Sequence, residues 1–174
     1  MKNIVFIGMP GSGKTTFGKI IAKKLNMPFI DMDEYIELNE KKTIKEMFDI
    51  SEKYFRDVES KYAIILGQLN SRVIATGGGI VKRKENIENL EKNSIIVFLN
   101  RPVENIISDI NMSTRPLLKD GIEAVYKLYN ERINLYKKYC HLEVYNDGGI
   151  EEVANKIIKK VEEWNSENTS NKRP

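Results

Sequence analysis

The chain has 174 residues and carries 28 lysines and arginines against 25 aspartates and glutamates, so its formal net charge is +3. This length suits one domain with a proper hydrophobic core, and a charge so small and evenly mixed argues against nucleic-acid or membrane binding. No apolar run is long enough to cross a bilayer, and the N-terminal residues lead straight into a strand-like run rather than a signal peptide. The single cysteine cannot form an internal disulfide. We therefore expect a cytoplasmic globular protein.

The first apolar run is followed by a glycine-rich motif. Residues 3–7 (Asn-Ile-Val-Phe-Ile) predict a buried strand, residues 8–15 fit G-x-x-x-x-G-K-[ST], and the residues that follow are apolar at helical spacing. In this context the N–H groups of the loop and the N-terminus of the helix favour the binding of a phosphate group. Lys14 can reach the outer phosphates, and the hydroxyl of Thr15 can bind Mg²⁺. The motif predicts a nucleoside triphosphate site, and a glycine turn without a ligand is the alternative.

Short apolar runs alternate with helical patterns along the rest of the chain. Strands are predicted at 29–30, 73–75, 95–99 and 142–145, and helices at about 51–69, about 122–139 and 153–164. Repeated strand–helix units favour an α/β fold with a parallel sheet covered by helices on both faces. We expect a single domain over residues 1–164 and a polar, disordered tail over residues 165–174.

The stretch from about Asp109 to Gly121 fits no regular element. It contains Arg115-Pro116 and ends in a glycine, between two predicted helices. A loop this long in a compact domain is often a lid that closes over a site, although a surface loop without a function is the alternative.

Two carboxylates, Asp31 and Asp33, follow the strand at 29–30. In open α/β sheets, ligands collect beyond the carboxyl ends of the strands. In an extended segment these side chains share one side, so one could face metal and phosphates while the other meets an acceptor. Asp33 also precedes a plausible helix start, so an N-cap is an equally good interpretation.

Three further features have both a functional and an ordinary structural interpretation. The run Gly77–Gly79 permits close approach of the backbone to a ligand, or forms a tight strand-to-helix turn. Arg56 lies three residues before Glu59 on a predicted helix, where a surface ion pair is the simpler interpretation. Arg132 could be a solvated helix charge. Spacing alone favours the structural interpretation of both arginines.

Together, these motifs resemble shikimate kinase. The family shares with this chain, in the same order, the phosphate loop, Asp31-x-Asp33, Phe55-Arg56-x-x-Glu59, Gly77-Gly78-Gly79, Arg115-Pro116-Leu117-Leu118 and Arg132-x-x-Leu135-Tyr136. The resemblance runs from about Asn3 to the last helix and implies the three-layer P-loop fold of nucleoside monophosphate kinases, with a five-stranded parallel sheet of order 2-3-1-4-5 flanked by helices. It also implies transfer of the γ-phosphate of MgATP to the 3-hydroxyl of shikimate, in the route to chorismate and aromatic amino acids.

The resemblance further implies roles for individual residues. Asp33 would hold the shikimate hydroxyls and help activate the one attacked, while Arg56 and Arg132 would grip the carboxylate with planar guanidinium groups. Arg115 would move in with the lid and contact the transferring phosphate, so that it forms the catalytic set with Asp33 and Lys14. The remaining roles are phosphate binding by Gly11, Ser12, Gly13, Lys14, Thr15 and Thr16, backbone contacts to substrate by Gly78 and Gly79, and Mg²⁺ binding by Thr15 directly and by Asp31 through water.

One position departs from the family pattern. Many shikimate kinases carry an arginine about seven residues before Arg-Pro-Leu-Leu, where it lies against the adenine, and this chain has Ser108 there. The loop at 146–149, which often supplies a second adenine contact, holds no arginine either. The substrates that the resemblance implies are shikimate and ATP, and this departure predicts weak discrimination among purine triphosphates as donors. Nothing in the sequence suggests more than a monomer.

Two alternatives remain open. Another small-molecule kinase of the same fold, such as a gluconate kinase or a nucleoside monophosphate kinase, is the first, although two arginines plus Asp33 favour an acceptor with both a carboxylate and a hydroxyl. A regulatory nucleotide switch is the second. A GTPase would normally show Asn-Lys-x-Asp and, after the third strand, Asp-x-x-Gly, and neither appears.

Overall fold

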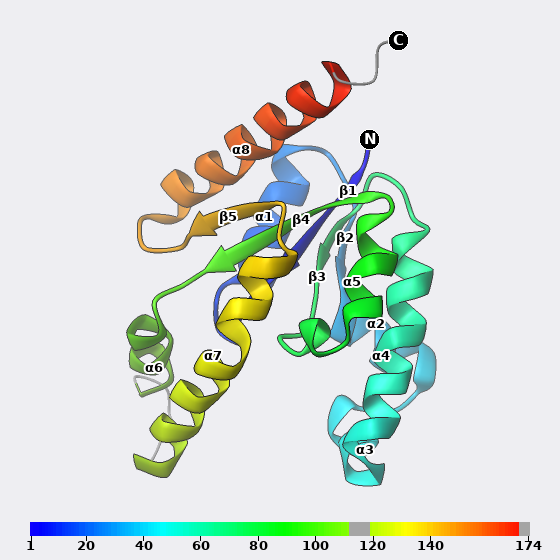
Figure 1. The fold of residues 1–174 in the computed structure, drawn as a ribbon, viewed down its shortest axis with the longest axis vertical. Coiled ribbons are helices and arrows are strands. Elements are labelled where there is room, and N and C mark those ends of the chain that lie inside the picture. The colour runs from blue at the N-terminus through cyan, green and yellow to red at the C-terminus, as the bar shows by residue number, and fades with distance from the viewer. Residues whose placement is uncertain (112–118, 171–174) are drawn as a thin grey trace.

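A computed structural model of the protein describes residues 1–111 and 119–170. Its strands are β1 (Asn3–Ile7), β2 (Phe29–Asp31), β3 (Val73–Ala75), β4 (Ser94–Asn100) and β5 (Leu142–Tyr145). They form one sheet of order β2-β3-β1-β4-β5, in which every neighbouring pair is parallel (Figure 1). The strands lie within a residue or so of the apolar runs that predicted them, and the strand order that the resemblance implied is confirmed.

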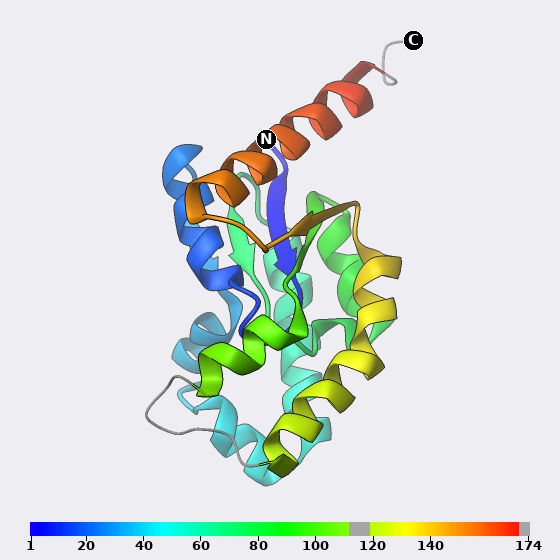
Figure 2. The same ribbon diagram turned by 90° about the vertical axis from the view of Figure 1, so that its left-hand side faces the viewer.

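Helices cover both faces of the sheet. One face carries α1 (Lys14–Lys24) and α8 (Ile150–Ser170), which contact each other. The other face carries α2 (Met32–Glu40), α3 (Ile44–Ile50), α4 (Glu52–Gly67), α5 (Lys84–Glu91) and α7 (Lys119–Tyr139). A 3-10 turn, η1 (Ile80–Lys82), follows β3, and α6 (Val103–Asn111) lies beyond the carboxyl end of β4, between α1 and α7 (Figure 2).

Successive side chains of the central strands pack alternately into two hydrophobic clusters, one on each face of the sheet. In β1, Ile4 and Phe6 pack with residues of α1 and α8, whereas Val5 and Ile7 pack with α2, α4 and α5. This period of two follows from the pleat of a strand, and both sets are apolar because helices cover both faces. The buried central strands give a rigid base for the loops that leave their carboxyl ends.

Both ends of the expected loop at 109–121 are helical. Helix α6 continues to Asn111 and α7 begins at Lys119, so both helices take residues from the expected loop at 109–121. Arg115 and the centre of the expected lid lie outside the described residues. In the ranges that the structure does describe, no helix is both long and apolar enough to cross a membrane.

The C-terminal helix is longer than expected. The sequence predicts a disordered tail from residue 165, but α8 continues to Ser170, so that expectation is wrong for residues 165–170. The Ser166 hydroxyl donates to the Glu162 carbonyl (2.9 Å) and the Asn168 amide donates to the Trp164 carbonyl (2.8 Å). These polar side chains bond back to the helix instead of ending it. Residues 171–174 lie outside the described residues.

Candidate active site

The loop between β1 and α1 has a backbone that glycine adopts most easily. Gly11 and Gly13 have φ angles of +79° and +100°, in the left-handed region where side chains are strained. Gly8 has φ +149°, and a Cβ there would lie 2.7 Å from the Leu99 carbonyl oxygen. The loop runs into the N-terminus of α1, where unpaired N–H groups and the helix dipole favour an anion. The geometry is that of a phosphate-binding loop.

Lys14, the first residue of α1, folds back over this loop. Its Nζ donates to the carbonyl oxygens of Gly8 (2.8 Å) and Met9 (2.7 Å). Burial lowers the pKa of Lys14 to about 8, although the carboxylates of Asp33 and Asp31 act in the opposite direction. Phosphate oxygens at the loop would restore the charge stabilisation that burial removes.

Asp31 connects the loop to α2. The Thr15 hydroxyl donates to Asp31 Oδ2 at 2.7 Å, and Asp31 Oδ1 accepts from the backbone N–H groups of Asp33 (3.1 Å) and Glu34 (3.3 Å). Asp31, with an extended backbone, is therefore the N-cap of α2. The interpretation of Asp33 as the cap is wrong, because Asp33 already lies within the first turn of the helix. The two carboxylates also do not share one extended segment.

Asp33 points into the site with an unsatisfied oxygen. Its Oδ1 is buried and has no hydrogen-bond partner within the described part of the chain. A Cβ built on Gly77 would lie 3.1 Å from this oxygen, so the carboxylate faces the glycine run. Burial, and secondarily Asp31, raises the pKa of Asp33 against the effect of Lys14. A buried acceptor left unpaired costs about 1–3 kcal/mol, which a ligand donor would recover.

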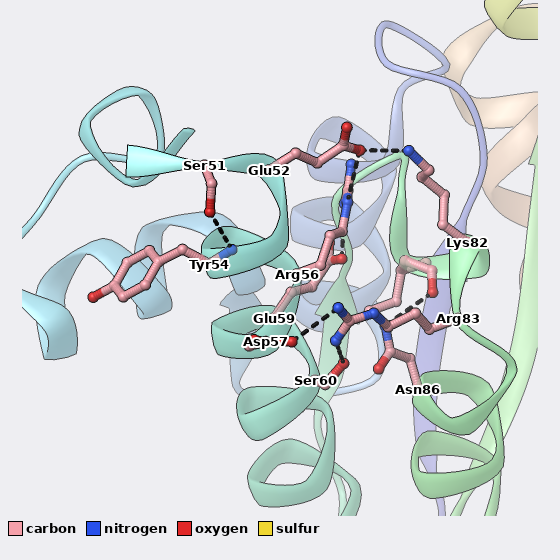
Figure 3. A network of polar contacts seen from close by, with 11 residues as sticks. Ser51, Glu52, Tyr54, Arg56, Asp57, Glu59, Ser60, Lys82, Arg83 and Asn86 are labelled. Carbon is pink, nitrogen blue, oxygen red and sulfur yellow. Dashed lines mark hydrogen bonds and ion pairs between the residues drawn. The ribbon is translucent and has the colours of Figure 1, made fainter. Parts of the chain in front are cut away.

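A buried ion pair on α4 fixes Arg56 (Figure 3). Its NH1 donates to Glu59 Oε2 at 2.8 Å, and the two side chains are only 10% and 1% exposed. Its Nε lies 3.5 Å from Glu52, which also pairs with Lys82 of η1. The predicted spacing is correct, but the interpretation as a surface pair is wrong, because this side of α4 faces η1 and the glycine run. Burial raises the pKa of Glu59, with Arg56 opposing the shift.

The glycine run lets two guanidinium groups approach its backbone. A Cβ at Gly79 would overlap the guanidinium of Arg56, and one at Gly78 would lie 3.2 Å from NH1 of Arg132. The Tyr136 hydroxyl donates to the Gly78 carbonyl at 2.7 Å, and burial raises the pKa of Tyr136 to about 12. Arg132 is half-buried beside the run, so it is not simply a solvated helix charge.

The run also forms the tight turn that was the alternative interpretation. The Ile80 N–H bonds to the Gly77 carbonyl at 3.2 Å, and the Lys82 N–H bonds to the Gly79 carbonyl at 3.0 Å. The two interpretations are therefore compatible at this position.

These segments enclose a cavity of about 440 Å³ beyond the carboxyl ends of the strands. It is lined by Pro10, Gly11, Gly13, Lys14, Thr15, Thr16, Asp31, Asp33, Thr76, Gly77, Gly78 and Arg101. Among the predicted site residues, Ser12 is buried within the loop. Three other predicted site residues do not line the cavity but lie at or beside the glycine run: Arg56, Gly79 and Arg132. Arg115 lies outside the described residues.

Sequence reasoning missed Arg101. It directly follows β4, its NH1 donates to the Gly11 carbonyl at 2.9 Å, and its NH2 pairs with Asp109 Oδ2 at 2.6 Å. The rule that drew attention to Asp31, that ligands collect where parallel strands end, applies equally to this position and could have found it.

A phosphate loop after the first strand of a parallel sheet, next to a half-buried carboxylate and two guanidinium groups, defines the class of P-loop kinases that act on small molecules. The family model "Shikimate kinase" matches residues 10–162 of this chain. The shikimate kinase of Clostridium botulinum (strain Alaska E43 / Type E3) is 53% identical over 162 residues, covering 92% of this chain and 98% of that protein. That of Clostridium beijerinckii is 48% identical, covering 92% and 96%. The chain belongs to the shikimate kinase family.

Solved structures agree with this assignment. The structure of shikimate kinase from Acinetobacter baumannii in complex with shikimate is 30% identical, covers 100% of this chain and 96% of its own, and superposes with a TM-score of 0.84. A gluconokinase from Sinorhizobium meliloti, at 13% identity and a TM-score of 0.69, shares the fold alone. The predicted family, fold and enzyme class are confirmed.

Proposed function

We propose that this enzyme transfers the γ-phosphate of ATP to the 3-hydroxyl of shikimate, giving 3-phosphoshikimate and ADP. One observation carries most of the argument: the half-buried Asp33 carboxylate, whose buried Oδ1 lacks a donor, lies between the phosphate loop and the glycine run that Arg56 and Arg132 adjoin. A substrate that bears a carboxylate and hydroxyls fits this arrangement, because guanidinium groups pair with the first and a carboxylate accepts from the second.

On the acceptor side, Asp33 would accept the proton of the attacked hydroxyl. Its raised pKa supports this role, because a carboxylate held in a buried site is a stronger base than one in water. Arg56 and Arg132 would bind the carboxylate of shikimate, and Gly78 and Gly79 would offer backbone contacts. The pair with Glu59 holds Arg56 in place before substrate arrives, which lowers the entropy lost on binding.

On the donor side, the loop and first turn from Gly11 to Thr16 would bind the phosphates. Lys14 would neutralise charge that develops on the transferred group, and Arg115 would add a second cation when its segment closes. Phosphoryl transfer depends mainly on such positioning and neutralisation. Exclusion of water by a closing lid would prevent hydrolysis of ATP as a side reaction.

The residues present also fit Mg²⁺. The Thr15 hydroxyl and the Asp31 carboxylate lie 2.7 Å apart, and both are hard oxygen ligands. Thr15 would bind the ion directly and Asp31 through water, while Mg²⁺ would neutralise the phosphate oxygens. Over residues 1–111 and 119–170 there is no cluster of three or more histidines, cysteines or acidic residues that could hold a metal. Mg²⁺ in kinases takes most of its ligands from phosphates and water, so it needs no such cluster.

A panel of acceptors tests the proposal. ADP release from ATP and Mg²⁺ would be followed with shikimate, gluconate and nucleoside monophosphates, and the product identified by phosphorus NMR. We expect turnover with shikimate alone. Preferred turnover with gluconate or a nucleotide would favour another kinase of this fold, and nucleotide binding without transfer to any acceptor would favour a switch.

We also propose that the enzyme acts as a monomer in the cytoplasm, without nucleic-acid or membrane partners. The small, mixed net charge of +3 supports the absence of polyanionic partners, and the single cysteine fits a reducing compartment. Light scattering of the purified protein tests the monomer, and a mass twice that of the 20.1 kDa chain would contradict it.

A further inference from the structure

Arg101 is a cavity residue to which the proposed mechanism gives no role. It leaves the carboxyl end of β4 and lines the cavity together with Gly11 and Gly13 of the phosphate loop. Its side chain is 21% exposed, so it is not fully buried beneath other residues.

Two contacts fix the guanidinium by its edges. NH1 donates to the Gly11 carbonyl (2.9 Å), and NH2 pairs with the Asp109 carboxylate (2.6 Å). The carboxylate offsets the positive charge, which makes the group less suited to a phosphate. Neither of these edge contacts covers a face of the planar group, and guanidinium planes stack well on aromatic rings.

The surroundings indicate where the rest of a nucleotide would lie. Asn146, which follows β5, also contacts the phosphate loop: its side chain donates to the Ser12 carbonyl at 2.9 Å, and its backbone N–H donates to the Asn100 carbonyl at 2.8 Å. The segments after β4 and β5 therefore flank the loop together. A nucleoside that continues from phosphates held at Gly11–Gly13 would leave the loop between Arg101 and Asn146.

We propose that Arg101 is a donor-binding residue whose guanidinium plane stacks on the purine base of the nucleoside triphosphate, with Asp109 as its positioning residue. This inference rests on the proposed kinase function. Asp109 lies on α6, so its ion pair with Arg101 connects this helix to the end of β4 and fixes the guanidinium beside the phosphate loop. Because stacking reads no hydrogen-bonding edge, it adds affinity for adenine and guanine alike.

Direct binding experiments separate base stacking from support of the phosphate loop. Calorimetry would measure ATP, GTP and inorganic tripolyphosphate, which carries the phosphates but no base, on the unmodified protein, Arg101→Ala and Arg101→Gln. We expect both variants to lose about two- to thirtyfold in affinity for ATP and GTP, the range typical of such stacking. Tripolyphosphate affinity should change by less than about twofold, and so should shikimate affinity, which also reports correct folding.

A matched control is Arg72→Ala. The Arg72 side chain donates to the nearby carbonyls of Asn70 and Ser71 (3.2 Å each), just before β3 begins and so at the end of that strand away from the cavity. This variant should bind all four ligands normally, and Asp109→Asn should show a smaller, ATP- and GTP-specific loss.

Equal losses for ATP and tripolyphosphate in the Arg101 variants would show that Arg101 only braces the loop and would overturn the proposal. Unchanged ATP affinity would overturn it too. Because no acceptor takes part, these outcomes are independent of which alcohol the enzyme phosphorylates.

Discussion

The ion pair between Arg56 and Glu59 allows one substitution to test folding and acceptor binding separately. In Arg56→Ala, the Glu59 carboxylate, 1% exposed, loses its donor. Removing one partner of a buried pair costs about 3–5 kcal/mol of folding free energy. In a protein of this size 1 kcal/mol shifts Tm by about 2–4 °C, so Tm should fall by about 6–20 °C. The contact with Glu52 adds little, because that carboxylate is half-exposed.

The penalty should depend on pH with a definite sign. Burial already raises the pKa of Glu59, and Arg56 opposes that shift, so removing Arg56 raises the pKa further. A carboxyl whose folded pKa exceeds its unfolded value loses stability as pH rises from the unfolded pKa through the folded one. Arg56→Ala should therefore lose less stability near the unfolded pKa of a glutamate, about 4.3, than at neutral pH.

Acceptor binding gives the second readout. Truncating one partner of a buried charge pair costs on the order of 2–5 kcal/mol, so shikimate affinity should fall roughly thirtyfold to several thousandfold while ATP affinity stays nearly unchanged. The double variant Arg56→Ala/Glu59→Gln replaces the unpaired carboxylate by a neutral amide. It should recover part of the lost Tm but none of the shikimate affinity.

The assay combines calorimetry with thermal unfolding on the three proteins. Unchanged shikimate affinity in Arg56→Ala, or its recovery in the double variant, would refute the reasoning and leave Arg56 with a purely structural role.

Asp33→Asn keeps the shape of the site but removes the proton acceptor, so kcat should fall by about 10²–10⁴ in a steady-state assay; near-normal turnover of the folded variant would remove Asp33 from the catalytic set. Lys14→Ala should lower kcat by about 10²–10³. Because burial lowers the pKa of Lys14 to about 8, phosphate binding should also draw a proton onto it near that pH, seen by calorimetry in two buffers; the same uptake in Lys14→Arg would contradict this origin. Gly79→Ala places a methyl on the Arg56 guanidinium and should raise the KM for shikimate about tenfold or more, equivalent to 1.4 kcal/mol, whereas Gly149→Ala, with nothing within 4 Å, should match the unmodified enzyme; equal KM values would disprove the steric argument. The enzyme should discriminate weakly between ATP and GTP, and Ser108→Arg should raise ATP affinity by no more than about tenfold; strong adenine selectivity in donor kinetics would show that other groups read the base.

The sequence by itself determined the elements that depend on local chemistry. The phosphate loop was predictable because glycine spacing sets the left-handed backbone at Gly11 and Gly13, and the flanking strand and helix follow from apolar periodicity. The three central strands, β1, β3 and β4, were predictable because both of their faces are buried, which makes each an apolar run. The edge strands β2 and β5 are only partly buried, and their shorter apolar runs still marked them. The order of the short motifs then indicated the family, which the comparisons confirmed.

Only the tertiary structure decided what each polar side chain touches. Whether Asp31 or Asp33 caps α2 depended on where β2 ends, and whether the Arg56–Glu59 pair is buried depended on which side of α4 faces η1. Because β3 lies between β1 and β2, Gly77 comes beside Asp33 and the phosphate loop. Arg101 reaches Gly11, ninety positions earlier in the chain, because β4 pairs with β1 and the segments that follow the two strands therefore lie side by side. Contacts across such separations are set by the packing of the whole sheet, and no local propensity encodes them.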